Sequence, residues 1–206
     1  MFIESETGLV PNRIIWMYGA EQERLFRQLS MMGVQLFSGF NREIVDSLDA
    51  NERNLIVLDD LMTEMKNSDD LEKLFTKGSH HKNLTVIYLV QNLFEKGKAT
   101  VSVSRNAHYI VLFKNPRNQV EVNTLASQMA VGNRRKSLLA AFQYATKKNF
   151  RYLVIDNRPE TDPGLRFRTK IFPGETTKLL ALDGDDCFSG VYKREKYEPP
   201  SRGDDG

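Results

Sequence analysis

The chain has 206 residues, which predicts one domain with appendages at roughly 150 residues per domain. Hydrophobic residues make up 40% of it and charged residues 27%, which excludes wholesale disorder and a collagen-like repeat. The single Cys187 excludes an intramolecular disulfide and a cysteine zinc knuckle. No apolar run is long enough to cross a bilayer, and the first residues include acids where a signal peptide would be basic and apolar. We therefore expect an intracellular protein that has no membrane partner.

The net charge of +2 is too small to indicate a nucleic-acid-binding protein by itself. Between Lys114 and Arg151, however, eight basic residues accompany a single acid, Glu121. Such a stretch can follow a phosphate backbone, and it is also typical of a solvated helix face without a ligand. Both interpretations remain open, and the candidate nucleic-acid-binding residues are Arg134, Arg135 and Lys136.

Apolar runs of strand length alternate with segments of helical spacing. The runs are continuous, which is typical of strands buried on both faces in a parallel sheet: Ile14–Tyr18, Leu55–Leu58, Leu84–Val90, Tyr109–Phe113 and Tyr152–Ile155. The helical segments contain Leu25, Phe26 and Leu29; Leu71, Leu74 and Phe75; Val122, Leu125 and Met129; and Leu138, Leu139 and Phe142. The alternation predicts a three-layer α/β fold with a mainly parallel sheet.

Capping and turn residues support this division. Ser68 can cap the helical segment that contains Leu71, before its acidic first turn, and Gly78 suits the end of that segment. Asn115-Pro116 ends the strand at Phe113, because proline has no N–H for a ladder. After about Asp183 the chain is rich in Gly, Asp, Pro and charge. We expect a domain over residues 1–182 and a flexible polar tail over residues 183–206.

Two adjacent acids follow the strand Leu55–Leu58. In an open parallel sheet the carboxyl ends of the strands form the edge where ligands bind. There Asp59 would hold Mg²⁺, directly or through water, and Asp60 would orient or deprotonate an attacking water, which is the Walker B pattern. The alternative is that Asp60 caps a helix that begins near Leu61.

The next strand ends in amides. Gln91 and Asn92 follow Val90, so they should lie at the same edge of the sheet. A glutamine amide both donates and accepts hydrogen bonds, so Gln91 could position water or sense a nucleotide's γ-phosphate. The alternative is a polar residue that only ends a strand.

Four segments together resemble the poxvirus-type genome-packaging ATPases of the FtsK and HerA superfamily of P-loop motors. Similar sequences occur in virophages and in Polinton or Maverick transposons. The resemblance spans about Arg13 to Pro173, and the segments that carry it are Leu58–Glu64 (LDDLMTE), Leu74–His81 (LFTKGSHH), Val90–Phe94 (VQNLF) and Asn106–Arg117 (NAHYIVLFKNPR).

The sequence lacks that family's phosphate loop. No Gly-Lys-Ser or Gly-Lys-Thr is present, and Gly97-Lys98-Ala99, the nearest sequence, lacks the hydroxyl residue and the second glycine. In the family's strand order the strand before this loop lies between those ending near Phe113 and at Gln91, so the resemblance implies an open slot there. Either those strands close up, or Met1 to Leu9 fills the slot, or the natural protein is longer.

The resemblance implies a truncated or degenerate genome-packaging ATPase of viral or transposon origin. Complete relatives use ATP and Mg²⁺, form homo-oligomeric rings and move double-stranded DNA, in the host cytoplasm or nucleus or associated with the virion. We expect this chain alone to hydrolyse no ATP. The alternative is a non-catalytic module that binds DNA or partner subunits through a basic face.

Two smaller motifs lie in the matching segments. Arg117 could act as an arginine finger on a neighbour's phosphate, although an ordinary exposed arginine fits the sequence as well. His80-His81 has no further ligand at zinc spacing, so a polar turn explains it better than a metal site.

Overall fold

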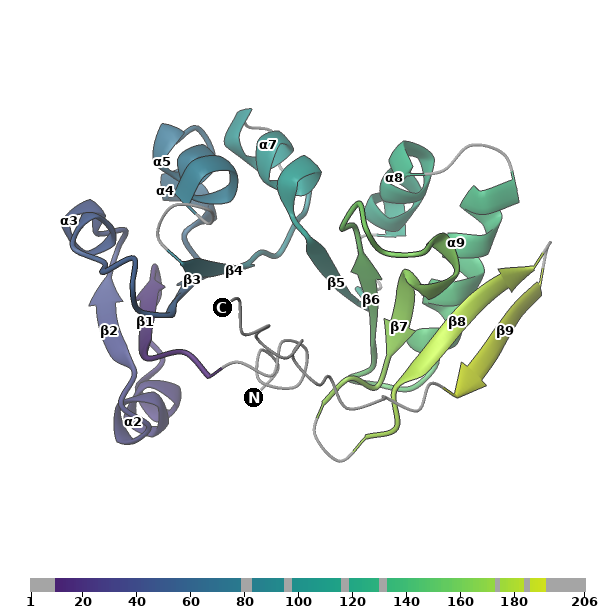
Figure 1. The fold of residues 1–206 in the computed structure, drawn as a ribbon, viewed down its shortest axis with the longest axis horizontal. Helices are drawn as coiled ribbons and strands as arrows, with labels where there is room; N and C mark the ends of the chain where they lie inside the picture. The colour runs from purple at the N-terminus through teal and green to yellow at the C-terminus, as the bar shows by residue number, and fades with distance from the viewer. Residues whose placement is uncertain are drawn as a thin grey trace, which may run out of the picture.

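The structure is a computed structural model that describes residues 10–78, 83–94, 98–115, 119–129, 133–172, 175–183 and 186–191. Its strands form two sheets, in the orders β2-β1-β3-β4 and β5-β6-β7-β8-β9 (Figure 1). The α/β class predicted from the sequence is therefore confirmed, with one parallel and one antiparallel sheet. Within these ranges no helix has both the length and the apolar character that a membrane crossing requires.

The four-stranded sheet is entirely parallel. Its strands are β1 (Arg13–Tyr18), β2 (Gln35–Ser38), β3 (Asn54–Asp59) and β4 (Leu84–Leu89). The central β3 is buried from Asn54 to Leu58, as its continuous apolar sequence predicts. In the ladder Tyr18 is the partner of Asp59, and Asp59 is the partner of Leu89. The carboxyl ends of β1, β3 and β4 therefore lie at one level.

Helices pack on one face of this sheet around its core. They are α3 (Arg42–Asp46), α4 (Met62–Met65), α5 (Asp69–Lys73), which continues as the π-helical turn η1 (Leu74–Gly78), and α7 (Lys98–Asn106). As predicted, Ser68 caps α5, and its Oγ accepts a hydrogen bond from the Asp70 N–H at 3.1 Å. The remaining helix, α2 (Glu23–Met31), packs its Phe26 ring 4.2 Å from that of Tyr18.

The five-stranded sheet is antiparallel, which differs from the mainly parallel sheet that we expected. Its strands are β5 (Tyr109–Phe113), β6 (Tyr152–Asp156), β7 (Phe167–Thr169), β8 (Lys178–Asp183) and β9 (Asp186–Val191), with the 3₁₀ turn η2 (Pro163–Leu165) before β7. Two helices, α8 (Gln119–Met129) and α9 (Asn133–Ala145), separate β5 from β6. A pair of helices returns the chain to the end it left, whereas a single crossover helix would have made β6 parallel to β5.

Each sheet ends in a strand with one unpaired edge. Within the described ranges, no strand pairs with the second edge of β4 or with the second edge of β5. Neither strand contains a charged residue or a proline, and Leu89 and Phe113 at their ends are 41% and 59% exposed. The strands that the resemblance places around a slot have therefore not closed up on each other. Met1 to Leu9, the alternative occupant, lie outside the described residues.

The predicted tail includes part of the second sheet. Strand β9 pairs with β8 in the register Leu182 to Cys187 and Asp183 to Asp186, although the sequence analysis placed this segment in a flexible tail. Residues 192–206 of the predicted tail lie outside the described ranges.

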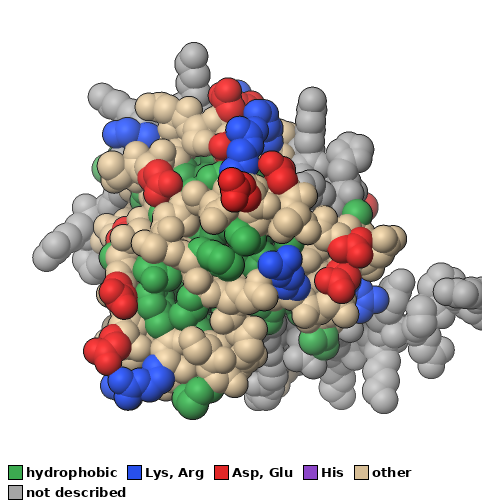
Figure 2. Space-filling view, turned by 90° about the vertical axis from the view of Figure 1, so that its left-hand side faces the viewer, with side chains coloured by type: hydrophobic (Ala, Val, Ile, Leu, Met, Phe, Trp, Pro, Cys, Tyr) green, Lys and Arg blue, Asp and Glu red, His purple; other side chains and the backbone are tan. Residues whose placement is uncertain are grey.

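The side of the molecule that carries β2 shows acidic and basic side chains mixed among hydrophobic ones, without a concentration of positive charge (Figure 2).

Candidate functional site

The structure brings Asp59, Asp60 and Gln91 together. They line one pocket of about 130 Å³ with Met62, Leu89 and Val90, at the carboxyl ends of β3 and β4. Parallel strands in register explain this arrangement, because both chains leave the sheet at the same edge. The pocket also adjoins the strand with the open edge, since β4 supplies Leu89 to it.

The backbone around Asp60 is held in an uncommon conformation. Asp60 has φ 54°, in the left-handed region that costs a non-glycine residue free energy. Gly19 lies against it, and a Cβ at this glycine would approach the Asp60 carbonyl oxygen to 2.1 Å. The Gly19 N–H also donates to the Asp59 carbonyl at 2.9 Å. The turn after β1 therefore needs a glycine so that the acidic turn after β3 can pack on it.

Gln91 is positioned by contacts from both halves of the molecule. Its backbone N–H donates to Sδ of Met62 at 3.3 Å, which fixes it beside the acidic turn. Two residues later, the Leu93 N–H donates to the Glu121 carboxylate on α8 at 2.6 Å. Leu93 and Phe94 pack against the hydrophobic core under the second sheet. The loop that carries Gln91 therefore connects the two sheets, beside the unpaired edge of β4.

The neighbours of Asp59 oppose its ionisation. Burial raises the pKa of Asp59, the negative charge of Asp60 raises it further, and the Trp16 indole N–H acts in the opposite direction. The Gln22 side-chain amide donates to Oδ2 of Asp59 at 3.5 Å, a long contact. Because burial and a like charge disfavour the charged form of Asp59, a nearby cation would stabilise it, which makes Asp59 a candidate cation ligand.

The sequence also allowed purely structural roles for these polar residues, and the structure excludes one of them for Asp60 and shows one for Asn92. Asp60 does not cap a helix, because Leu61 is the N-cap of α4 and no side chain caps it. Asn92 has a local role, since its Oδ1 accepts the Phe94 N–H at 3.0 Å in a turn. Gln91 has an exposed side chain that lines the pocket.

The donor set of the pocket suits a hydrated magnesium ion better than a metal held by protein alone. Among the described residues no group of three or more His, Cys, Asp or Glu side chains could hold a metal. Mg²⁺ keeps several waters and commonly takes one or two carboxylates together with substrate phosphates, so Asp59 and Asp60 fit it. The volume of about 130 Å³ leaves room for several waters around such an ion. It is smaller than the roughly 300 Å³ at which small-molecule sites begin.

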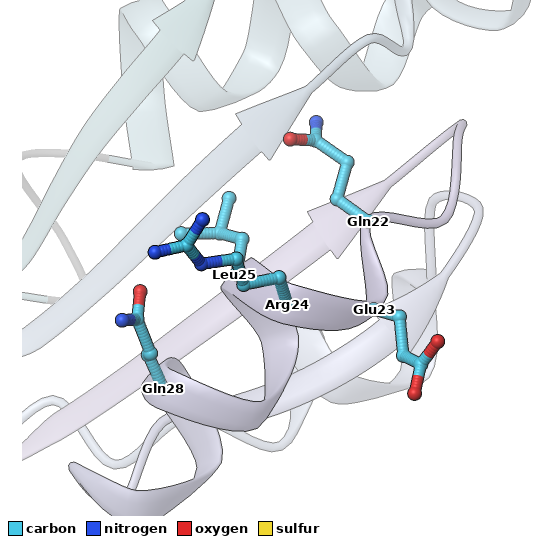
Figure 3. A pocket seen from close by; sticks show the side chains of 5 residues that line it. All are labelled: Gln22, Glu23, Arg24, Leu25 and Gln28. Carbon is cyan, nitrogen blue, oxygen red and sulfur yellow. The ribbon is translucent and has the colours of Figure 1, made fainter.

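A larger hollow lies beside the start of α2. It measures about 370 Å³ and is lined by Gln22, Glu23, Arg24, Leu25 and Gln28 (Figure 3). These side chains all come from one helix start, and Figure 3 shows Gln22 directed away from Glu23. The hollow is therefore an open surface, and its relevance to the site is that Gln22 also reaches Asp59.

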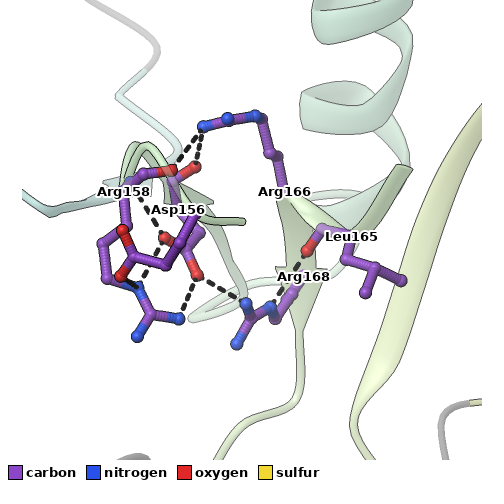
Figure 4. Close-up of polar contacts among 6 residues, drawn as sticks. Asp156, Arg158, Leu165, Arg166 and Arg168 are labelled. Atoms are coloured by element: carbon purple, nitrogen blue, oxygen red, sulfur yellow. Dashed lines mark hydrogen bonds and ion pairs between the residues drawn. The ribbon is translucent and has the colours of Figure 1, made fainter. Parts of the chain in front are cut away.

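A second polar cluster surrounds Asp156 at the end of β6. Asp156 is fully buried and accepts hydrogen bonds from Arg158 at 2.8 Å and from Arg168 at 2.5 Å (Figure 4). Arg166 donates to the carbonyl oxygens of Asp156 and Arg158, and the Arg158 guanidinium lies 5.0 Å from the centre of the Tyr109 ring. Burial opposes ionisation of Asp156, but the hydrogen bonds and charges of the arginines outweigh it and lower its pKa. This cluster ties β5, β6 and β7 together, and the sequence analysis missed it because its members become neighbours only in the antiparallel sheet.

The remaining predicted site residues lie elsewhere or cannot be placed. Arg135 and Lys136 are exposed at the start of α9 and do not line the acidic pocket. The side chain of Arg134 lies outside the described part, as do Arg117 and the His80-His81 pair. Three residues that position the acidic turn and the Gln91 loop were not predicted from the sequence: Gly19, Gln22 and Glu121. For Gly19 a signal was available, because it is a glycine directly after an apolar strand.

Comparison of the chain with protein-family models, with curated proteins and with solved structures finds no match.

We predict that Asp59→Asn stabilises the fold in the absence of metal. Because the pKa of Asp59 is raised in the folded protein, the unfolded chain ionises first as the pH rises above 3.8, and wild-type stability falls over that window. The variant lacks this loss, so its Tm should exceed the wild-type Tm at pH 7 and match it below pH 3.8. Thermal denaturation across this pH range is the measurement, with the exposed Glu52→Gln as control. An unchanged or lower Tm at pH 7 would contradict the account of Asp59.

We predict the opposite effect for Asp156→Asn. The change leaves Arg158 and Arg168 without their buried partner, which should lower the free energy of unfolding at pH 7 by about 3 kcal/mol. The difference should shrink as the pH falls below 3.8, because the unfolded wild-type chain then binds a proton at this carboxyl while the folded protein, whose Asp156 pKa is lower, does not. Urea denaturation measures both effects. The control is Glu160→Gln, whose carboxylate is 70% exposed and should contribute under about 1 kcal/mol; an equal loss in both variants would contradict the role given to Asp156.

Proposed function

We propose that this chain is a truncated or degenerate genome-packaging ATPase of viral or transposon type, whose nucleotide pocket lacks one wall. The observation that carries the proposal is the shared pocket of Asp59, Asp60 and Gln91, directly beside the open edge of β4. Acids after one parallel strand and an amide after the next are what a nucleotide-hydrolysing site needs at this edge. The resemblance of the LDDLMTE and VQNLF segments supports the same assignment.

Each residue has a separate task in this proposal. When bound, Mg²⁺ and ATP would supply the phosphate to be attacked and neutralise its charge. Asp59 is the more enclosed of the two acids and would hold the cation, directly or through water. Asp60, exposed at the pocket, would orient the attacking water or accept its proton, and the Gln91 amide would hold that water by donating and accepting hydrogen bonds.

The same residues cannot complete the reaction alone. A phosphate loop contributes backbone N–H groups and a lysine that hold the phosphates, and the sequence has no such loop. The pocket of about 130 Å³ is smaller than the roughly 300 Å³ at which small-molecule sites begin, so it would not enclose a nucleoside triphosphate. We therefore propose that the acidic edge becomes catalytic only when a further strand and phosphate loop adjoin β4.

The second candidate is a non-catalytic module that binds DNA or partner subunits. The specific observation in its favour is the absence of the phosphate-loop sequence combined with the basic stretch between Lys114 and Arg151. An in-frame coding sequence upstream that ends in Gly-Lys-Ser or Gly-Lys-Thr would favour the ATPase, and an upstream sequence without one would favour the module.

Phosphate release tests the proposed incompleteness. The chain alone, incubated with ATP and Mg²⁺, should release phosphate at the background rate, and Asp60→Asn should give the same rate. A malachite-green assay at several protein concentrations measures this, with a complete P-loop ATPase as positive control. Magnesium-dependent release well above background that Asp60→Asn abolishes would contradict the proposal that the pocket is incomplete.

A further inference from the structure

The longest acid-free basic segment that the structure describes runs from Asn133 to Arg151. It comprises α9 and the turn that leads into β6, and it carries six basic residues and no Asp or Glu. We call it the basic segment. Its apolar side packs in the hydrophobic core under the five-stranded sheet through Leu138, Ala141 and Ala145. The opposite side of the helix and the turn are therefore presented to the outside in a defined orientation.

The exposed side of the basic segment places positive charge at both ends. Arg135 and Lys136 are exposed in the first turn of α9, and Lys147 and Lys148 are exposed just beyond its last turn. Neither Lys147 nor Lys148 forms an ion pair with any described residue.

The turn also carries an aromatic residue, Phe150, whose ring is not packed in the protein core. Phe150 is 96% exposed and has φ 59°, a left-handed conformation that is a genuine outlier for a bulky side chain. Among the described residues it makes no ring contact. A strained backbone usually persists where the surrounding structure or the function requires it. Here packing supplies no compensation, because almost the entire ring faces solvent.

We propose that the basic segment binds a nucleic-acid strand through this turn, with Lys147 and Lys148 on phosphates and the Phe150 ring stacked on a base. The exposed Lys147 and Lys148 complement a polyanion, whereas Arg151 is already paired with the Glu175 carboxylate. An exposed ring beside these cations matches the base faces beside a phosphate backbone. A lipid surface fits less well, because stable insertion needs a larger apolar face than one ring. This proposal places the principal contact at the end of α9 opposite to the predicted Arg134, Arg135 and Lys136. It deepens the second candidate function, on which it rests, and it is independent of the acidic pocket, since none of its residues lines that pocket.

Binding of labelled DNA to the full chain tests the proposal. Fluorescence anisotropy with a 20-nucleotide strand and the matching duplex, between 50 and 200 mM salt, gives the affinity and its salt dependence. The double variant Lys147→Ala, Lys148→Ala should reduce the slope of log K against log salt by roughly 1.4 for the strand or 1.8 for the duplex. The control double variant Lys66→Ala, Lys73→Ala should leave the slope unchanged.

The aromatic contact has a separate signature. Phe150→Ala should weaken binding by roughly 5- to 150-fold without changing the salt slope, and Phe150→Tyr should retain the affinity. Phe150→Gly should also weaken binding, yet raise Tm by roughly 2–4 °C because glycine relieves the left-handed strain. The exposed Met31→Ala is the matched control for loss of apolar surface.

Four outcomes would overturn the proposal. These are no DNA binding at 50 mM salt, a salt slope that the lysine substitutions leave unchanged, an affinity that Phe150→Ala leaves unchanged, and equal binding of anionic phosphatidylserine vesicles that the same variants abolish. Failure here leaves the acidic pocket untouched, because the phosphate-release and Asp59→Asn measurements do not involve the basic segment.

Discussion

The extent of each sheet depends on which strands find a backbone hydrogen-bonding partner. The parallel ladder ends at β4 and the antiparallel ladder begins at β5, and no described strand joins them. Natural sheet edges are usually protected by charges, prolines or bulges, because unpaired N–H and C=O groups invite another strand. The sequences LTVIYL and YIVLF contain neither charges nor prolines. Both strands therefore have the composition of interior strands, although each stands at an edge.

The acidic pocket depends on that same boundary. Asp59 and Asp60 are positioned by the paired side of the sheet, through the β1 to β3 ladder and the close approach of Gly19. Gln91 instead follows the edge strand, and its own N–H donates to Met62. The loop after it is held from across the boundary, where the Glu121 carboxylate on α8 accepts the Leu93 N–H. The pocket thus has two built walls and an open side where β4 has no partner. Under the proposed function, this open side is where a further strand and phosphate loop would adjoin β4.

The sequence predicted the strongly patterned parts of this fold, and the missed parts depend on distant contacts. The five apolar runs and the helices at Phe26, Leu71, Leu125 and Leu138 are confirmed, because each contains a complete local signal. Strand β2 was missed because QLFS is a short edge strand with only two apolar residues. The direction of β6 depends on how two helices pack, which no local pattern encodes. For β9 a signal existed, because Asp183-Gly184 between two apolar runs is typical of a hairpin.

Residue-resolved amide hydrogen exchange tests the open edges most directly. In an edge strand, alternate N–H groups point to the paired neighbour and the others point outward. We therefore expect alternating protection along Leu84–Leu89 and Tyr109–Phe113, with every second amide exchanging orders of magnitude faster, while all amides of Leu55–Leu58 stay protected. Uniform protection of β4 and β5 at the level of β3 would mean that both edges are paired, and it would contradict the account of an incomplete sheet.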